Sequence, residues 1–227
     1  MSSDQCNAPT PAPEIEWRDG ELPVATKFDD PYFSLTDGLA ETRHVFLAGN
    51  DLPARFCDGF HVAELGFGTG LNFLATWAAW RAGGQQGQLR FTSFEAFPMT
   101  PTDIARALRS FPELSPYSAV FLEHGGGDFT TPQVALRVVP GDARQTLPAW
   151  QGRADAWFLD GFSPAKNPEL WHKDLMYSVA NHTVPHGTFA TYTAAGHVRR
   201  ALTEAGFDVE RVQGHGRKRH MSRGRLR

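Results

Sequence analysis

A glycine-rich segment at residues 64–70 could bind a ligand through its backbone. It reads Glu-Leu-Gly-Phe-Gly-Thr-Gly and lies between an apolar run and a helical pattern. Glycines let a backbone turn tightly and approach a ligand closely, and a helix N-terminus favours negative groups. A dinucleotide site would want a further glycine at position 71, where this chain has leucine. The spacing ExGxGxG, with Glu64 two residues before the first glycine, is instead typical of S-adenosylmethionine sites.

S-adenosylmethionine suits such a loop because its ammonium group favours a nearby carboxylate and its own carboxylate favours the helix end. A glycine-rich turn that binds no ligand is the alternative interpretation of the same residues. The residues expected to contact the cofactor in this segment are Glu64, Gly66, Phe67, Gly68, Thr69, Gly70 and Asn72.

Two further acidic residues follow expected strands. Glu95 comes directly after residues 89–94, where its carboxylate could accept hydrogen bonds from both ribose hydroxyls of the cofactor. Asp142, followed by Ala143, comes after the next expected strand and could accept from the adenine amino group. Asp142 could equally be the N-cap of a short helix over residues 143–149. We therefore expect Glu95, Asp142 and Ala143 to complete the cofactor site, with the N-cap alternative open.

The segment from Asp160 to Trp171 reads DGFSPAKNPELW and begins at the end of an apolar strand. In open α/β sheets, ligands bind outside the carboxyl ends of the strands. A carboxylate beside an aromatic ring can hold a substrate amine and remove its proton, so Asp160 is the predicted catalytic residue. An Asx-turn leading into a helix at Pro168 is the alternative.

Composition excludes several classes of protein. The 227 residues carry a formal net charge of −3 and 41% hydrophobic residues, as in an ordinary globular protein. No apolar run is long enough to span a membrane, and the first residues lack a secretory pattern, so we expect a cytoplasmic protein. Two cysteines cannot form a disulfide framework, and the nine histidines lack ligand-like spacing. We therefore expect no metal and no membrane partner.

The C-terminus is strongly basic although the whole chain is nearly neutral. Residues 211–227 contain seven arginines and lysines and no acid. Such a segment could contact RNA phosphates, or it could be solvated or paired with the acidic N-terminus. The residues expected to contact RNA are Arg199, Arg200, Arg217, Lys218 and Arg219.

Alternating strand and helix patterns are expected to position these residues in an α/β fold. Strands are predicted at 60–65, 89–94, 134–139, 155–160, 187–192, 207–212 and 218–223, with helices at 71–82, 102–111, 143–149, 167–182 and 195–205. The pattern predicts a Rossmann-like, mostly parallel sheet with a closing antiparallel pair. We expect residues 1–14 to be a flexible tail, 15–58 an irregular extension packed on the core, and 59–227 the main domain.

The chain resembles the methyltransferase domain of the bacterial tRNA 5-methylaminomethyl-2-thiouridine biosynthesis proteins (MnmC type, or MnmD when standalone). The resemblance spans about residues 17–224 and rests most specifically on GFGTGLNFL (66–74) and DGFSPAKNPELW (160–171). Supporting segments are FDDPYFS (28–34), GLAETRHVFLAGNDLPAR (38–55), FEAFP (94–98), TYTAAGHVRRAL (191–202) and GHGRKRHM (214–221). The family usually has Glu where this chain has His220, which puts the local geometry of the last strand in doubt.

The resemblance implies a class I methyltransferase that transfers a methyl group from S-adenosylmethionine to the 5-aminomethyl nitrogen of the tRNA wobble (2-thio)uridine. Substrate contacts are expected from Tyr32, Ser34, Phe162, Pro164, Lys166 and Asn167. In bifunctional relatives a FAD-dependent oxidoreductase domain follows and prepares the amine. Nothing follows residue 227, so we expect that activity to be absent from this chain, which is either a standalone enzyme or a part of a bifunctional one. A separate enzyme could then supply the aminomethyl substrate.

A neutral primary amine attacks a sulfonium without a covalent enzyme intermediate. Cys6 in the tail and Cys57 before the core are poorly placed to attack a pyrimidine ring, which argues against enzymes that methylate C5 through a cysteine. Three alternatives remain: a small-molecule N-methyltransferase of the same fold, an NAD-dependent oxidoreductase with an atypical glycine loop, and a non-catalytic nucleic-acid-binding module.

Overall fold

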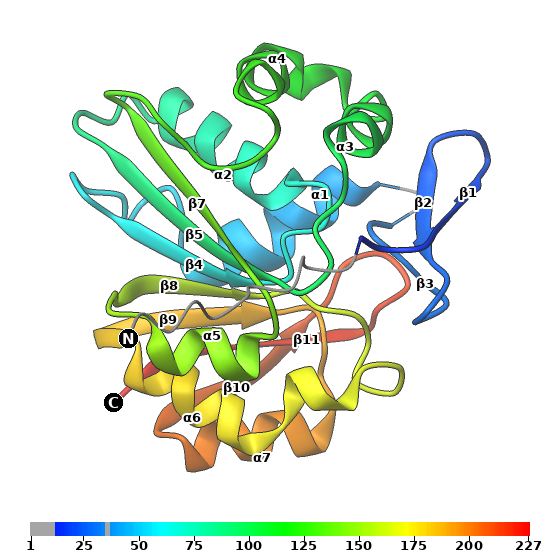
Figure 1. The fold of residues 1–227 in the computed structure, drawn as a ribbon. Helices are drawn as coiled ribbons and strands as arrows, with labels where there is room; N and C mark the ends of the chain where they lie inside the picture. Colours follow the sequence, from blue (N-terminus) through cyan, green and yellow to red (C-terminus); the bar gives the residue numbers. More distant parts are fainter. Residues whose placement is uncertain (1–11, 35–36) are drawn as a thin grey trace, which may run out of the picture.

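A computed structural model describes residues 12–34 and 37–227, so part of the predicted tail (1–14) lies outside the described residues. Its centre is an eight-stranded sheet with the strand order β10-β11-β9-β8-β4-β5-β7-β6 (Figure 1). The strands are β4 (His61–Leu65), β5 (Leu89–Glu95), β6 (Phe129–Thr130), β7 (Val134–Pro140), β8 (Ala154–Leu159), β9 (Thr183–Thr191), β10 (Phe207–Gln213) and β11 (His220–Leu226).

The central strands β7, β5, β4, β8 and β9 run parallel to one another. β10 and β11 form the predicted antiparallel pair, and β11 adds antiparallel to β9. After β4 the chain builds the sheet outward through β5 and β7, and then returns to place β8 on the other side of β4. The order of strands therefore reverses at β4, which is where ligands bind in sheets of this kind.

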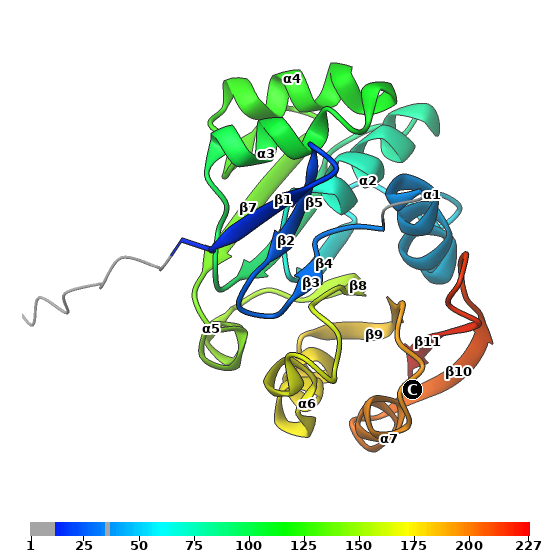
Figure 2. The ribbon, with the colours of Figure 1, turned by 90° about the vertical axis from the view of Figure 1, so that its right-hand side faces the viewer.

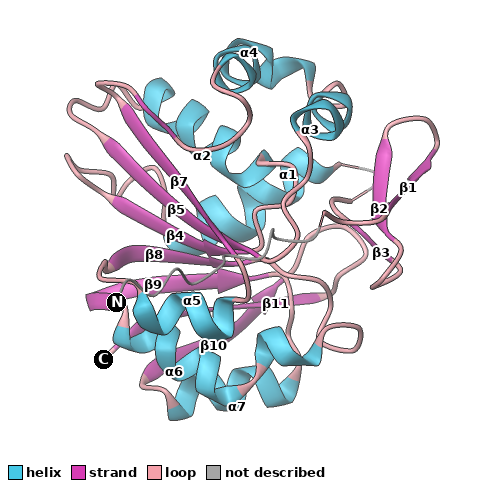
Figure 3. Cartoon of the chain, viewed as in Figure 1, coloured by secondary structure: helices cyan, strands magenta, loops and turns pink. Residues whose placement is uncertain are grey.

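Helices cover both faces of this sheet (Figure 3). One face carries α1 (Gly38–Thr42), η1 (Arg43–Leu47), η2 (Ala48–Asn50), α2 (Leu71–Ala82), α3 (Pro101–Leu108), η3 (Pro112–Leu114) and α4 (Ser115–Glu123). The other face carries α5 (Ala143–Ala149), η4 (Pro168–Trp171), α6 (Lys173–Asn181) and α7 (Gly196–Glu204). Each face has its own buried apolar cluster, so the sheet is enclosed as parallel sheets usually are.

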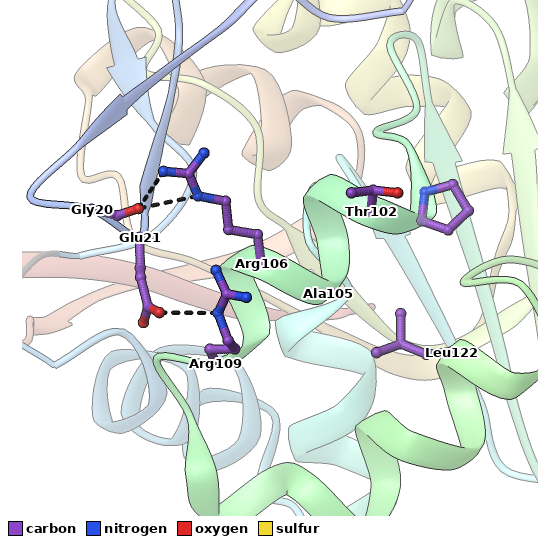
Figure 4. Close-up of a pocket in the computed structure, with 8 residues that line it drawn as sticks. Gly20, Glu21, Thr102, Ala105, Arg106, Arg109 and Leu122 are labelled. Carbon is purple, nitrogen blue, oxygen red and sulfur yellow. Dashed lines mark hydrogen bonds and ion pairs between the residues drawn. The ribbon is translucent and has the colours of Figure 1, made fainter.

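The interpretation of residues 15–58 as irregular is wrong. β1 (Ile15–Arg18), β2 (Leu22–Ala25) and β3 (Asp30–Pro31) form a separate antiparallel sheet, and helical turns follow. The β1–β2 hairpin packs against α3: Arg106 donates twice to the Gly20 carbonyl and lies 4.1 Å from the Trp17 ring centroid. Arg109 pairs with Glu21 at 3.1 Å in the same open pocket (Figure 4). A cation over an indole and a charge-assisted hydrogen bond both hold the hairpin to the main body.

Other elements differ from the predictions at their ends. Between the helix predicted at 102–111 and the strand predicted at 134–139, where no element was predicted, the chain forms α4 and the short strand β6. The helix predicted over 167–182 is divided at His172 into η4 and α6. β8 ends at Leu159, so Asp160 lies just beyond the strand and not within it. In the described part of the chain, no helix is both long and apolar enough to cross a membrane.

Candidate active site

The predicted acidic residues and the glycine loop meet at the carboxyl ends of the parallel strands. Three backbone hydrogen bonds join the loops there: Asp160 N to Leu65 O, Gly66 N to Phe94 O, and Gly141 N to Glu95 O. The loops line one cavity of about 1520 Å³. Viewed from this edge, the β1–β3 sheet lies in front of the parallel strands (Figure 2). Phe28, Asp30 and Tyr32 line the cavity, so the N-terminal segment forms a wall of the site.

The glycine loop follows β4 and leads into α2. Gly66, Gly68 and Gly70 have φ values of +88°, +53° and +78°, a region that side chains other than glycine rarely adopt. A Cβ atom on Gly66 would lie 2.2 Å from the Asp160 carbonyl oxygen. The sequence therefore needs glycine here because two adjacent loops touch through their backbones. Gly66, Phe67, Gly68 and Thr69 line the cavity, whereas Gly70 is the N-cap of α2 behind it.

Glu95 holds the glycine loop from the end of β5. One carboxylate oxygen accepts from Gly68 N at 2.9 Å, and the other accepts from Phe97 N at 2.8 Å. Glu95 also lines the cavity. Because a carboxylate can accept about four hydrogen bonds, two donors leave it able to accept from ligand hydroxyls.

Asp142 is the N-cap of α5, as the alternative interpretation held. Its carboxylate accepts from Arg144 N at 2.9 Å and pairs with the Arg144 guanidinium. The hydrogen bonds from Arg144 lower the pKa of Asp142 below its ordinary value. Asp142, Ala143 and Arg144 all line the cavity, so the cap lies beside the space a ligand would fill. Its contact with adenine stays a prediction.

The structure places Glu64 behind the cavity wall, where its side chain is fully buried. Its carboxylate accepts from the Asn72 amide at 2.8 Å and from the Ser93 hydroxyl at 2.7 Å. Burial raises the pKa of Glu64 well above its ordinary value. This position does not suit the predicted contact with a cofactor ammonium, because the Glu64 side chain is fully buried and is not part of the cavity lining.

Asp160 lies on the cavity wall where β8 ends. Its Oδ2 accepts from the Asn72 amide at 2.6 Å. Burial raises the pKa of Asp160 to about 7, partly offset by the Asn72 hydrogen bond and by Lys218. A carboxyl group with a pKa near neutrality can bind a protonated amine and accept its proton.

Aromatic rings from two distant segments meet beside Asp160. Phe162 stacks on Phe28 with centroids 4.6 Å apart and meets Tyr32 edge-on at 5.3 Å. Burial and the charge of Glu95 raise the pKa of the Tyr32 hydroxyl above its ordinary value. Phe28, Tyr32 and Phe162 all line the cavity, so these rings give it an apolar surface beside Asp160.

The loop after Asp160 is tied to the N-terminal segment. Asp30 accepts from Ser163 N at 2.9 Å, and Lys166 donates to the Asp29 carbonyl and lies 3.8 Å from the Asp30 carboxylate. Among the predicted substrate residues, Tyr32, Ser34, Phe162, Lys166 and Asn167 line the cavity; Pro164 is outside the lining.

The predicted RNA-binding residues fall into two groups. Arg217 and Lys218, in the loop between β10 and β11, line the cavity, whereas Arg199, Arg200 and Arg219 are outside its lining. The Lys218 ammonium lies 2.8 Å from the Glu41 carboxylate and 4.1 Å from the Tyr192 ring centroid. Lys218 is thus part of the cavity wall, which its position in the basic tail did not indicate.

Other tail residues pair with acids on the neighbouring strand. Arg223 lies 3.2 Å from Glu210, and Arg227 lies 2.8 Å from Asp208. Both acids belong to β10, so sheet formation partly neutralises the run of positive charge.

A family model described as S-adenosyl-L-methionine-dependent methyltransferase matches residues 114–227. The chain belongs to this methyltransferase family. The matched half contains Asp160 and the basic tail, whereas the glycine loop precedes it. The NAD-dependent alternative is therefore wrong, in agreement with Leu71 at the position where a dinucleotide site wants glycine.

Curated relatives match this methyltransferase along most of its length. It is 45% identical over 227 aligned residues to the "tRNA 5-methylaminomethyl-2-thiouridine biosynthesis bifunctional protein MnmC" of Chromobacterium violaceum. The match covers 93% of this chain but 34% of that relative, so the chain spans about a third of its length.

Among solved structures, MNMC2 from Aquifex Aeolicus matches with a TM-score of 0.74 and 26% identity, covering 97% of this chain and 72% of that one. The N-methyltransferase NodS from Bradyrhizobium japonicum matches at 0.50 and 12% identity, covering 83% of this chain and 93% of that one. At that identity the likeness extends to the fold alone.

Several residues of this site were missed by the sequence analysis. Phe28 and Asp30 belong to the motif FDDPYFS (28–34), and Tyr192 is the second residue of TYTAAGHVRRAL (191–202). Both segments were singled out in the sequence, so these cavity residues could have been found from them. Glu41 and Thr42 belong to the segment GLAETRHVFLAGNDLPAR (38–55), but a short helix with mixed residues predicts no particular partner for either side chain. Among the described residues, no group of acidic, histidine or cysteine side chains has the arrangement of a metal site.

Proposed function

We propose that this methyltransferase transfers a methyl group from S-adenosylmethionine to the 5-aminomethyl nitrogen of a wobble (2-thio)uridine in tRNA. The observation that carries the proposal is that the glycine loop and Asp160 open into a single cavity. Its volume exceeds the 300–1,000 Å³ typical of a pocket for one small ligand. A cofactor and an extruded nucleoside can therefore be bound together.

The relatives support the choice of substrate. The curated protein from Chromobacterium violaceum is named for biosynthesis of 5-methylaminomethyl-2-thiouridine in tRNA, and the 45% identity runs along 93% of this chain. A methyl group on an aminomethyl nitrogen is the chemical difference that a methyltransferase would introduce to give such a product.

The residues on one side of the cavity fit S-adenosylmethionine. Gly66 and Gly68 line the cavity with their backbone in the left-handed conformation, and the N-terminus of α2 follows the loop. Glu95, with remaining acceptor capacity, would hold the ribose hydroxyls, and the α5 cap at Asp142 would lie near the adenine. The cofactor supplies an electrophilic methyl group on its sulfonium sulfur.

Asp160 would act on the substrate amine. At neutral pH a primary amine is mostly protonated and must lose a proton before it can attack. A carboxylate at the cavity wall attracts the ammonium, fixes the nitrogen's direction and accepts the proton. Phe162, Tyr32 and Phe28 would contact the base, and the remaining acceleration comes from alignment of the nitrogen with the methyl group.

The β10–β11 loop, with Arg217 and Lys218 on the cavity lining, would contact the tRNA backbone. Arg217 lies on the lining of the cavity in the β10–β11 loop, where a phosphate could approach while the nucleoside enters. The free amine would come from a separate enzyme or from another part of a longer protein, because the reaction assigned to this site adds the methyl group only.

Mass spectrometry of wobble nucleosides provides the test. tRNA carrying 5-aminomethyl-(2-thio)uridine is incubated with the protein and S-adenosylmethionine, and the nucleoside should gain the mass of one methylene group. Asp160→Asn should abolish most of this gain while cofactor binding persists. An unchanged nucleoside with wild-type protein that binds the cofactor would overturn the tRNA substrate and favour a small-molecule amine.

A further inference from the structure

We propose that Asn72 is a positioning residue whose side-chain amide holds the Asp160 carboxylate toward the substrate amine, with Thr42 and Glu64 fixing that amide. The inference rests on the proposed function, because it assigns Asp160 the role described there. It differs from the sequence-based expectation, in which Asn72 and Glu64 contacted the cofactor.

The hydrogen bonds of the Asn72 side chain define its orientation completely. Its Nδ2 donates to Asp160 Oδ2 at 2.6 Å and to Glu64 Oε1 at 2.8 Å. Its Oδ1 accepts from the Thr42 hydroxyl at 2.8 Å. Both amide protons are thus used, and the oxygen faces a donor. A flipped amide would turn its oxygen toward the Asp160 and Glu64 carboxyl oxygens, so the orientation present is the one that donates to both carboxyl groups and accepts from Thr42.

Four separate elements supply this network. Thr42 ends α1, Asn72 lies in the first turn of α2, Glu64 lies in β4, and Ser93 in β5 is the cross-strand neighbour of Glu64. Thr42 and Asn72 are 4% and 6% exposed, and Glu64 and Ser93 are fully buried. Side chains packed this way cannot reorient independently. The N-terminal segment therefore acts on Asp160 through Thr42, besides walling the cavity.

The charges around Asp160 explain why a neutral amide suits this role. Burial raises the pKa of Glu64 and so favours its neutral form; one Asn72 amide proton is donated to Glu64 and the other to Asp160. A cation in place of the amide would form an ion pair with Asp160. The carboxylate would then stay ionised but would be less able to bind the substrate ammonium. The titratable and charged groups that face Asp160 from the packed elements are Asp30, Glu41, Glu64, Tyr192 and Lys218.

The first measurement is the titration of Asp160 in the free protein. Carbon-13 NMR of labelled aspartate carboxyls follows each group, and the resonance that disappears in Asp160→Asn identifies Asp160. Asn72→Leu should raise the pKa of Asp160 by roughly one unit, because it removes a hydrogen bond to the charged form. Thr42→Val should raise it by a smaller amount, and Thr42→Ser should restore the wild-type value.

Thr76→Val is a matched control for Thr42→Val. Thr76 is also a buried threonine that bonds to Asn72, but its hydroxyl donates to the Asn72 main-chain carbonyl at 2.6 Å. Both variants lose one buried hydroxyl, so both should lower the melting temperature. Only Thr42→Val acts on the amide, so only that variant should move the titration of Asp160.

Kinetics give the second measurement. With aminomethyl-uridine tRNA, Asn72→Leu should lower kcat about 10- to 100-fold and leave the affinity for S-adenosylmethionine unchanged. Weakened cofactor binding with an unmoved Asp160 titration would overturn the inference and return Asn72 to the cofactor site. Equal titration shifts in Thr42→Val and Thr76→Val would overturn it as well. A wild-type protein that leaves tRNA unmethylated contradicts the proposed function alone, since the titration is measured without substrate.

Discussion

At the scale of single residues, the environment of Asp160 predicts how the reaction depends on pH. The raised pKa means that Asp160 is mostly protonated below pH 6 and mostly ionised above pH 8. Because the ionised form is the one that binds an ammonium and accepts its proton, kcat should rise with pH through about 7. Asp160→Asn should remove this step from the profile. A wild-type rate that falls through the same range would contradict the role of Asp160.

A second residue-scale prediction concerns Glu95. Glu95→Gln removes the negative charge, and its amide would bring a donor against the Gly68 or Phe97 N–H. Loss of charge-assisted hydrogen bonds should weaken S-adenosylmethionine binding by about 1–3 kcal/mol, measured by calorimetry. Glu169→Gln is the matched control, since it removes the charge of another carboxylate that lines the cavity, in η4. Equal losses in both variants would argue for a general charge effect.

The sequence predicted that the carboxylates of the site would lie close together. Glu95, Asp142 and Asp160 each come just after an apolar strand, and parallel strands align their carboxyl ends, so their proximity follows from the fold class. The partners of Asn72 could not be predicted that way. Whether its amide faces a cofactor or two carboxyl groups depends on side-chain packing against α1, which has no regular pattern in the sequence.

At the scale of helices and strands, an element could be predicted where residues in the sequence marked its ends and its apolar pattern was long enough. α2 has the bounds expected for it, because Gly70 and Gly83 delimit a run of residues that are mostly buried. The β1–β2 hairpin was missed because its strands have four residues and Pro23 interrupts the second. Its turn nevertheless carried a signal: Asp19 and Gly20 have φ values of +49° and +86°, and glycine and aspartate are residues that tolerate this conformation in turns.

The turn from β4 into α2 allows a prediction at this scale. Gly66→Ala should abolish measurable S-adenosylmethionine binding and lower the melting temperature, because the new methyl group would overlap the Asp160 carbonyl. Gly84→Ala provides the control. Its φ of +64° imposes similar backbone strain, roughly 1–2 kcal/mol, but no atom lies within 4 Å of the new Cβ. Gly84→Ala should lower the melting temperature moderately and leave cofactor affinity unchanged. If both variants lower the melting temperature and the cofactor affinity equally, backbone strain alone explains the effect of Gly66→Ala.

At the scale of the whole molecule, a formally negative protein must bind a polyanion through a local surface. The structure divides the basic tail into arginines that already have acidic partners and those that line or adjoin the cavity. Arg223 and Arg227 pair with Glu210 and Asp208 across β10 and β11. Arg217 lies on the cavity lining and Arg219 two residues further along the same loop. Net charge alone could not have separated these two groups.

The division predicts how tRNA binding depends on salt. Arg217→Gln with Arg219→Gln should weaken tRNA binding and reduce the slope of log affinity against log salt by about 0.7–0.9 for each phosphate that the protein no longer neutralises. Arg223→Gln with Arg227→Gln removes the same charge from the same basic tail, but from residues with acidic partners, so the slope should change less for this double variant. Binding is measured by fluorescence anisotropy at several salt concentrations, and S-adenosylmethionine affinity verifies that each protein is folded. If both double variants lose affinity and slope equally, tRNA responds to total charge and the loop between β10 and β11 has no special part in binding it.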